Sequence, residues 1–402
     1  MRTAYKCRAY PTPEQAAMLS RTFGCVRVVW NQTLAWRHRR WHQDRVSTNV
    51  PQANAFLTHL KQAEEFAWLN EVSSVPLQQV LRTQQRAFAN FFAGRTRYPR
   101  YKSRRGRQSA EYTRSGFRWR DGRLTLAKTS MPLELVWSWP GIDPAALDPT
   151  TVTVSRDPDE RWYVSLSVDG AGLVRAPATG AMVGVDLGIT DFAVTSDGER
   201  ISNPRHLQRK AANLARYQRR MARKQHTSSN RRKARIKVAR AHAKVRDARR
   251  DFLHKTSTRL VRDYDVIVVE DLAVANMVRN RTLARAISDC GWGEFRRQLE
   301  YKCARVGRDL VVVDRWFPSS KTCSACGHLL ARLSLGTRTW RCPFCGTRHD
   351  RDVNAAKNIL AAGRAVTACG GEVRHPNNRM HPPTKQEPQP VKAGIPDLGR
   401  GR

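Results

Sequence analysis

The pattern of apolar and polar residues changes twice in the first 178 residues. Residues 1–11 alternate in the manner of a short strand. Residues 12–97 place apolar side chains at spacings of three and four, which predicts helices, with Thr12 as the N-cap of the first. Residues 98–178 return to short β-rich runs separated by Gly, Asp and Pro, as in a small barrel. If residue 5 belongs to the first strand of that barrel, the helices form a domain inserted into it.

The second half of the chain has the pattern of an α/β domain. Three apolar runs are typical of buried strands: residues 182–189, 266–269 and 310–313. We therefore predict a multidomain α+β protein in which an α/β domain spans residues 179–320 and 348–364. Beyond it, residues 365–402 are Pro-rich and polar, which predicts a disordered tail.

Residues 205–255 are the most basic part of the chain. Leu207, Leu214 and Met221 lie on one apolar stripe, and a polar turn around Ser228 follows, so this block is predicted to be two antiparallel helices. A coiled-coil spacer would give a similar pattern. The density of Arg and Lys favours a helical hairpin that lies along nucleic acid.

The length and net charge of the chain restrict the range of possible functions. A chain of 402 residues exceeds one compact core, which suggests two or three domains. Its 72 Lys and Arg against 34 Asp and Glu give a net charge of +38, which favours a polyanionic partner. A membrane surface is the competing polyanion, but no apolar run approaches ~18 residues and no signal peptide opens the chain. We therefore expect nucleic acid, no membrane, and a cytoplasmic location in which the scattered cysteines stay reduced.

Two further stretches combine side chains that suit nucleic acid. The helix predicted after residue 73 has a face of amides and guanidiniums that can read base edges in a major groove, although a solvated face is the alternative. The next stretch is basic with interleaved tyrosines, a mixture that holds phosphates and stacks bases. The candidate contacts are Gln78, Gln79, Arg82, Tyr98, Arg100, Lys102, Arg104 and Arg105.

Four cysteines form two CxxC pairs with fifteen residues between the inner cysteines. Gly327 and Gly346 follow the pairs and permit a tight turn after each. Four thiolates on two such turns suit tetrahedral Zn²⁺; two disulfides are the alternative, which the lack of a secretory signal disfavours. We predict a zinc ribbon over residues 321–347 with the ligands Cys323, Cys326, Cys342 and Cys345.

Three carboxylates stand out from their surroundings. Asp186 interrupts an apolar strand, where a carboxylate is costly unless it is paired or binds a metal. Glu270 closes another strand, at the end where ligands collect in open α/β sheets. Asp352 opens a helix, where an aspartate is often only a favourable dipole partner. If the fold unites them, such oxygen ligands without histidine select Mg²⁺ or Mn²⁺, and two ions roughly 4 Å apart can cleave a phosphodiester.

These motifs resemble those of the TnpB family, transposon-encoded proteins related to type V CRISPR effector nucleases. The likeness rests on GVDLGITDFAV, VIVVEDL, PSSKTCSACG, CPFCG and HDRDVNAAKNIL, and it runs from the N-terminal helices through residue 362. It implies a RuvC-like nuclease domain of the RNase H fold that carries the zinc ribbon, with Asp186, Glu270 and Asp352 as catalytic metal ligands. The family ligand stands two residues before the asparagine of DRDVN, which favours Asp352 over Asp350.

The resemblance also implies RNA-guided cleavage of DNA. A guide RNA from the transposon end would pair with target double-stranded DNA, while the N-terminal helices and barrel read a short motif beside the target. A separate transposase at the same locus is an expected companion. Three other functions stay open: a guide-dependent repressor that does not cut, a transposase that performs strand transfer itself, and a basic zinc-ribbon RNA-binding protein. A repressor would be expected to lack the acids, and an RNA-binding protein alone would leave Asp186 unexplained.

Overall fold

The computed structural model describes residues 2–139, 141–170, 175–334 and 336–368, which form two compact units. The first unit comprises residues 1–174, 204–253 and 281–291, and the second comprises residues 175–203, 254–280 and 292–402. The disordered tail predicted from residue 365 begins as helix, because α9 continues to Ala368. The rest of that prediction lies outside the described residues.

An antiparallel five-stranded sheet is the base of the first unit. Its order is β2 (Gln108–Thr113), β6 (Pro149–Arg156), β7 (Trp162–Asp169), β1 (Arg2–Tyr10) and β5 (Glu134–Val136). The strands β3 (Phe117–Arg120) and β4 (Arg123–Leu126) form a hairpin that a bridge between Leu124 and Leu133 joins to the segment before β5. Because Tyr5 pairs with Leu166 of β7, residue 5 belongs to the same sheet as strands more than a hundred residues later.

Three helices lie in the chain between β1 and β2: α1 (Pro13–Arg39), α2 (Val50–Gln62) and α3 (Ser74–Phe92). The predicted N-cap of the first is confirmed, because the Thr12 hydroxyl accepts a hydrogen bond from the Gln15 backbone and the Gln15 side chain accepts one from the Thr12 backbone. A π-helical turn (Arg40–Asp44) follows α1, and short 3-10 turns occupy Glu64–Glu71, Arg114–Gly116 and Pro144–Ala146. One buried core joins these helices to the sheet.

The basic block of residues 205–255 lies in two consecutive helices, α4 (His206–Ala222) and α5 (Ser229–Asp263). The start of α4 is fixed by Asp289 at the end of α7 (Ala284–Cys290), whose carboxylate accepts hydrogen bonds from the backbone amides of Leu207 and Gln208. Those amides have no partner within the helix, so the carboxylate satisfies them and complements the helix dipole.

The second unit is built on a mixed five-stranded sheet. Its order is β10 (Arg200–Ser202), β9 (Asp191–Thr195), β8 (Met182–Leu187), β11 (Val266–Glu270) and β12 (Asp309–Val313). The last three strands are parallel, and β9 and β10 are antiparallel to their neighbours. The predicted α/β character of this region is therefore confirmed, with the three predicted buried strands side by side at β8, β11 and β12.

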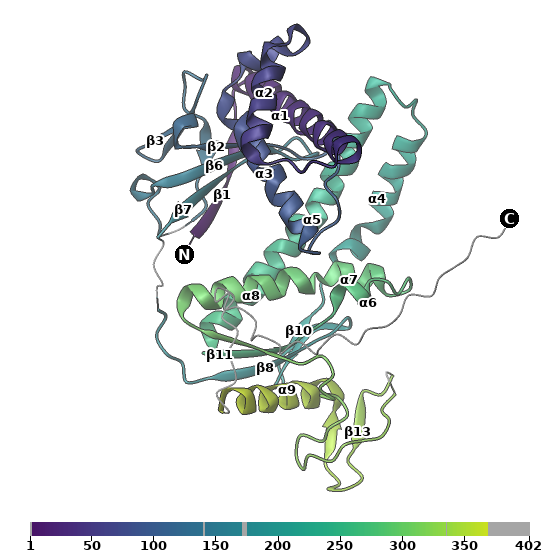
Figure 1. Ribbon diagram of the computed structural model, residues 1–402. Helices are drawn as coiled ribbons and strands as arrows, with labels where there is room; N and C mark the ends of the chain where they lie inside the picture. Colours follow the sequence, from purple (N-terminus) through teal and green to yellow (C-terminus); the bar gives the residue numbers. More distant parts are fainter. Residues whose placement is uncertain (1, 140, 171–174, 335, 369–402) are drawn as a thin grey trace, which may run out of the picture. The chain divides into compact units, whose positions relative to one another are not determined.

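Helices cover both faces of this sheet: α8 (Trp292–Val306) on one face and α9 (Arg351–Ala368) on the other (Figure 1). Two glycines let α9 approach closely. A Cβ at Gly184 would lie 2.7 Å from the backbone nitrogen of Leu360, and one at Gly363 would lie 2.5 Å from the side chain of Val268. Only glycine fits such contacts without a shift of the helix.

A small hairpin completes the second unit. It consists of β13 (Thr339–Arg341) and β14 (Arg348–Asp350), and it leads directly into α9. A short helix, α6 (Val274–Met277), follows β11. Within the described part of the chain, we find no helix with the length and apolar character needed to cross a bilayer.

Candidate active site and cysteine cluster

The register of two parallel strands brings Asp186 and Glu270 together. Val185 on β8 is paired with Val269 on β11, so the next residue of each strand occupies the same level of the sheet. Neighbouring strands lie about 4.8 Å apart, and residues at one level of a parallel pair point to the same face. Asp186 and Glu270 are 84 residues apart in the sequence, which equals the offset between paired residues of β8 and β11.

The third acid reaches the same face of the sheet through α9. Gly184, two residues before Asp186, is the position at which the backbone of Ala356 and Leu360 contacts β8. Asp352 is one helical turn before Ala356 and therefore projects from the same side of α9. The structure thus places all three predicted acids on the face of the sheet that α9 covers.

The neighbouring Asp350 has a different position and different partners. Its carboxylate accepts hydrogen bonds from the backbone amides of Asp352 at 3.1 Å and Val353 at 3.0 Å, which caps the start of α9. It also pairs with Arg200 at 2.6 Å. Asp350 is therefore occupied in fixing the helix from which Asp352 projects.

Burial and mutual repulsion disfavour the charged forms of these acids. Burial, followed by the charges of Glu270 and Asp352, raises the pKa of Asp186 to about 7. Burial also raises the pKa of Glu270, and a hydrogen bond from Ser319 opposes that rise. Acids of this kind favour a bound cation, because a cation restores the charged state that burial penalises.

Arginines beside the acids were not found by sequence reasoning. Arg200 on β10 lies 3.8 Å from the carboxylate of Asp352, and Arg338 lies 3.6 Å from it. Arg200 comes from a segment remote in sequence, whereas Arg338 stands directly before β13 of the hairpin that leads into α9. Nothing in their local pattern distinguishes them from the many other arginines of this basic chain. They supply positive charge beside the carboxylate of Asp352.

Ser319 was also missed as part of the acid site. Its hydroxyl donates to the carboxylate of Glu270 at 2.5 Å, and its backbone carbonyl accepts from the side chain of Asn358 on α9 at 2.7 Å. Ser319 and Asn358 are both buried. The helix that carries Asp352 is therefore connected through two hydrogen bonds to the orientation of Glu270.

The four predicted cysteines converge, as the sequence predicts. Their sulfur atoms all lie within 4.8 Å of one another. Cys323 is 3.7 Å from Cys345, and Cys326 is 3.7 Å from Cys342. A tetrahedron with zinc–sulfur distances of about 2.3 Å has edges of about 3.8 Å, so this spacing fits a single Zn²⁺. All four are free cysteines, which excludes the disulfide alternative in this structure.

The two turns that carry the cysteines have matching backbone geometry. In each, the glycine amide donates to the carbonyl of the first cysteine of the pair, from Gly327 to Cys323 at 2.9 Å and from Gly346 to Cys342 at 3.0 Å. Both glycines have positive φ values, of 78° and 71°, which other residues adopt only with strain. The predicted role of the glycines is confirmed.

Partners of the cysteine cluster come from β14 and α9. His349 places Nε2 3.0 Å from the sulfur of Cys323, and its ring packs 4.6 Å from that of Trp340. Asn354 donates from its side chain to the carbonyl of Thr322 at 2.7 Å. These contacts surround the first turn with groups that hold it in place, as outer-shell partners of a metal site do.

The carboxylates are spaced more widely than the thiols. Among the described residues, the cysteines are the one group of three or more acidic, thiol or imidazole ligands whose atoms all lie within 4.8 Å of one another. The oxygens of Asp186, Glu270 and Asp352 are thus not gathered around one point as the sulfurs are. Of the two metal sites predicted, the structure displays the geometry of the zinc site more completely.

The predicted nucleic-acid contacts on α3 differ in exposure. Gln78 and Arg82 are exposed, whereas Gln79 is only 7% exposed. The prediction that Gln79 contacts nucleic acid is therefore wrong, because this side chain is buried where α3 packs against its neighbours. Gln78 and Arg82 remain predicted contacts.

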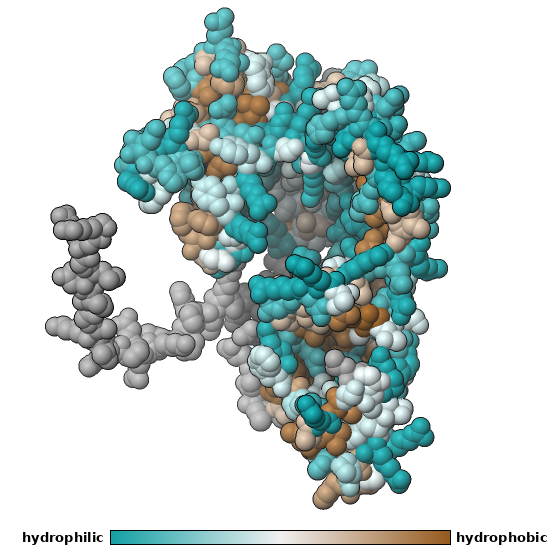
Figure 2. Space-filling view, turned by 90° about the vertical axis from the view of Figure 1, so that its right-hand side faces the viewer, coloured by the Kyte–Doolittle hydropathy of each residue, from teal (hydrophilic) through white to brown (hydrophobic). Residues whose placement is uncertain are grey.

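The contacts predicted between residues 98 and 105 also differ. Tyr98 packs edge-on against Phe88 and Phe91, and the Lys102 ammonium lies 4.3 Å from the centre of the Trp30 ring. Burial lowers the pKa of Lys102. Both side chains thus have partners within the first unit, although Tyr98 is still 40% exposed. Arg100, Arg104 and Arg105 are exposed. Hydrophilic residues also predominate on the molecular face shown in Figure 2.

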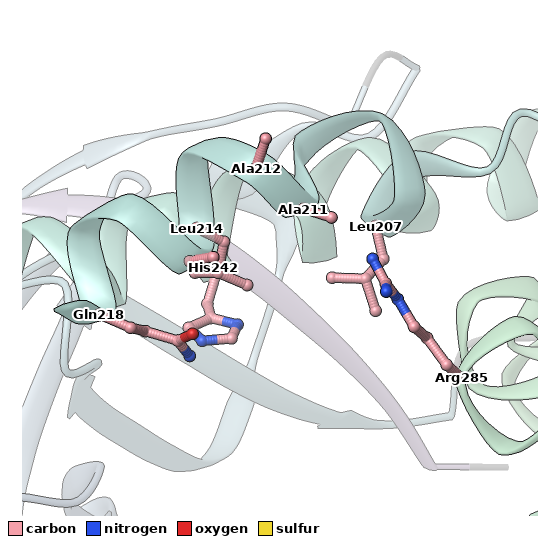
Figure 3. Close-up of a pocket in the computed structure, with 8 residues that line it drawn as sticks. Leu207, Ala211, Ala212, Leu214, Gln218, His242 and Arg285 are labelled. Carbon is pink, nitrogen blue, oxygen red and sulfur yellow. The ribbon is translucent and has the colours of Figure 1, made fainter. Parts of the chain in front are cut away.

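A hollow of about 530 Å³ lies among α4, α5 and α7 of the first unit. In Figure 3, Gln218 lies beside His242, and Leu207 lies beside Arg285. The remaining lining is apolar, from Ala211, Ala212, Leu214 and Ala215. It contains no carboxylate, so it does not coincide with the candidate acid site.

These features define a class of protein: a mixed α/β protein with carboxylates on one face of a mixed five-stranded sheet and a separate four-cysteine cluster whose geometry suits a metal ion. Comparison with known families assigns parts of the chain. Residues 152–281 match the family described as "Probable transposase" (OrfB_IS605), residues 292–359 match "Cas12f1-like, TNB domain", and residues 1–45 match "Helix-turn-helix domain".

Relatives of similar length identify the family. A Streptomyces pristinaespiralis protein named "Putative RNA-guided DNA endonuclease" is 56% identical over 402 residues, which is 99% of each chain. An Escherichia coli K12 protein with the same description, InsQ, is 33% identical over 403 residues, or 96% of this chain and 97% of its own. The chain therefore belongs to the TnpB family of the OrfB_IS605 type, as its motifs predict.

One solved structure shares the fold of this chain. It is a cryo-EM structure of a Cas12f1–sgRNA–target DNA complex, with a TM-score of 0.56, 13% identity and coverage of 90% of this chain and 98% of that chain. At that identity the likeness concerns the fold alone.

Proposed function

We propose that this protein is an RNA-guided, Mg²⁺-dependent DNA endonuclease, encoded by a transposon, that cuts beside a short adjacent motif and supports maintenance of the transposon. The observation that carries the proposal is the convergence of Asp186, Glu270 and Asp352 on one face of the central sheet. Two relatives that match nearly the whole chain are named for this activity. The TnpB motifs and the fold likeness to Cas12f1 support a RuvC-like nuclease domain in the second unit.

The chemistry of the donor set fits Mg²⁺ or Mn²⁺. Asp186, Glu270 and Asp352 offer carboxylate oxygens only, the ligands that these hard cations prefer. Two such ions, when bound, activate the attacking water and neutralise the leaving oxygen of a phosphodiester. The wide spacing of the carboxylates suits a pair of ions better than a single one.

The protein's own residues position this chemistry. Ser319 orients the carboxylate of Glu270 by donating to it, and Asp350 fixes the start of the helix from which Asp352 projects. Buried apolar residues precede Asp186 on β8 and Glu270 on β11, and they exclude water from one side of these carboxylates. Exclusion of water strengthens electrostatic interactions at the site. Arg200 and Arg338 lie beside Asp352, where they offer contacts to a phosphate of the substrate.

In this proposal Zn²⁺ has a structural role. The four thiols would hold it in a ribbon of residues 321–347, and the ion would supply folding energy to a segment with a small core of its own. The Asn354 and Asn358 amides attach the first turn of this ribbon to α9. The ribbon thereby supports the segment that contains Ser319.

The remaining partners follow from charge. A net charge of +38 suits a protein that holds a long guide RNA as well as target double-stranded DNA, with base pairing supplying the sequence specificity. We further propose that the guide comes from the transposon end, that the sheet and helices of the first unit read the adjacent motif, and that the protein acts in the bacterial cytoplasm at the nucleoid. A separate transposase at the same locus would perform strand transfer.

The test is programmed cleavage. The protein is purified from its native locus, the bound RNA is sequenced, and a plasmid that carries the matching target is incubated with the complex and Mg²⁺. We expect breaks at the programmed site alone, and only with Mg²⁺. Binding of the plasmid without breaks would favour a repressor, and joined rather than cut products would favour direct strand transfer.

A further inference from the structure

The closed end of the α4–α5 hairpin is a fixed structure. The guanidinium of Arg231 donates to the backbone carbonyl of Met221 at 3.1 Å, in the last turn of α4, and to that of Lys224 at 2.8 Å, in the turn that follows. The Ser228 hydroxyl accepts from the Arg231 backbone at 3.2 Å and so caps the start of α5. This arginine therefore has a structural role that sets it apart from its basic neighbours.

A pocket of about 300 Å³ lies against this end of the hairpin. Four cations line it, one from α4, one from the turn after α4 and two from α5, together with Tyr217, Asn230 and Ala234; the cations are Arg220, Lys224, Lys233 and Lys237. The lining contains no carboxylate. Residues 205–255 as a whole contain 19 Lys and Arg against 2 Asp, so no excess of acid exists nearby in the sequence.

The pocket cations have no ionic partner among the described residues, in contrast to Arg240 and Arg246 of the same hairpin. Arg246 pairs with Asp157 at 3.0 Å, and Arg240 pairs with Glu160 at 3.7 Å. No such pair involves a pocket cation within the described part of the chain. Like charges that converge without acids repel one another, so a bound anion would relieve that cost.

Tyr217 adds a surface for a base. Its ring lines the pocket, and the Arg216 guanidinium packs 5.5 Å from the ring centre. Asn230 offers both a hydrogen-bond donor and an acceptor. Phosphate-binding cations, an aromatic ring and an amide are together the groups that single-stranded nucleic acid requires. The volume is at the low end of the range for small-ligand sites and suits one nucleotide.

We propose that this pocket binds one unpaired nucleotide of the guide RNA, with its phosphates against Lys233 and Lys237 and its base on Tyr217. The inference rests on the proposed function in taking RNA as the partner, and it assigns that partner to particular residues. The hairpin is the most basic part of the chain, and a long RNA needs many phosphate contacts. An RNA strand that leaves a paired region at this point would insert its first unstacked base.

The first test compares two double variants that remove equal charge from α5. Lys233→Gln with Lys237→Gln changes the pocket, and Arg232→Gln with Arg235→Gln changes exposed cations of the same helix outside it. Binding of the copurified RNA to full-length protein is measured between about 50 and 200 mM salt. We expect the salt slope to fall by about 1.4 for the pocket pair, at about 0.7 per lost single-strand phosphate contact, and by less than half of that for the control pair.

The second test concerns the base. Tyr217→Ala is expected to weaken RNA binding by about 5- to 150-fold, the range for one base–aromatic stack, whereas Tyr217→Phe retains it. Ultraviolet crosslinking of the copurified RNA should attach a nucleotide to the peptide that contains Tyr217. Circular dichroism of each variant checks that the hairpin stays helical.

The RNA-binding results distinguish a specific pocket from general charge attraction and from a DNA-binding site. Equal losses for the two double variants would show general charge attraction and overturn the pocket. Intact RNA binding, with loss of target DNA binding by the RNA-loaded complex, would assign the pocket to DNA and overturn the proposal. Because the assays measure RNA binding, they give a result even if programmed cleavage fails. Failure of cleavage with the expected RNA phenotypes would refute the proposed function and leave the pocket standing.

Discussion

Replacing Asp186 by asparagine should stabilise the metal-free protein. Asparagine keeps the size of the side chain but removes the ionisable group. Burial, with the charges of Glu270 and Asp352, raises the pKa of Asp186 from 3.8 to about 7. The charged carboxylate is therefore disfavoured in the folded state, and the folded wild type loses stability as pH rises through the window from about 4 to about 7.

The size of this loss of stability follows from the rise in the pKa of Asp186. About three pH units at about 1.4 kcal/mol each make the full penalty about 4 kcal/mol above pH 7, as an order of magnitude. Between pH 5 and pH 8 the advantage of Asp186→Asn over wild type should grow by about 3 kcal/mol. Hydrogen exchange of peptides that contain β8, corrected for the intrinsic pH dependence, reports this free energy in the second unit alone.

Magnesium should reduce the advantage. The zinc-loaded proteins are compared without added Mg²⁺ and then with saturating Mg²⁺; chelators are avoided because they would remove zinc. Mg²⁺ at about 100 times its dissociation constant should stabilise wild type by about 2.7 kcal/mol and leave Asp186→Asn unchanged. Asp191→Asn on the neighbouring strand is the matched control and should keep the Mg²⁺ response. An advantage that is constant with pH, or equal protection of Asp186→Asn by Mg²⁺, would refute this reasoning.

Three other substitutions test other parts of the account. Gly184→Ala should lower the free energy of unfolding by about 1–3 kcal/mol or more, because its Cβ would collide with the backbone of α9; a thermal midpoint equal to wild type would contradict this. Cys342→Ser should reduce bound zinc from about one ion per chain to near zero and unfold the ribbon, as metal analysis and proteolysis would show; a folded, zinc-loaded variant would count against the thiol site. Ser319→Ala removes the donor that restrains the pKa of Glu270, so the pH profile of cleavage should move upward with about a tenfold loss of rate at neutral pH; an unshifted profile would mean that Ser319 acts elsewhere.

Local patterns in the sequence predicted many of the helices and strands and the four-cysteine cluster. The Thr12 cap, the strands that contain Asp186 and Glu270, and the turns after each CxxC pair all depend on neighbouring residues. Periodicity, capping chemistry and glycine placement act over a few positions, so they can be read from the chain.

Contacts between remote segments could not be predicted in the same way. The 84-residue separation of two acids equals the strand register, but only the paired strands reveal that equality. Ser319 and Arg200 have no local signal for their carboxylate partners, because those partners lie far away in the sequence. Gln79 was misjudged because α3 is covered on more than its apolar face, which a single helical stripe does not show.

The central claim is that three carboxylates cut DNA under the direction of a bound RNA. The most direct measurement is cleavage of a programmed plasmid by wild type and by Asp186→Ala, Glu270→Ala and Asp352→Ala, with RNA binding measured on the same preparations. Asp271→Asn serves as the control, because that carboxylate is adjacent to Glu270 but pairs with Arg296. We predict that the three alanine variants bind RNA and do not cut, and that the control cuts. Cleavage by any of the three, or loss of RNA binding together with cutting, would contradict the account.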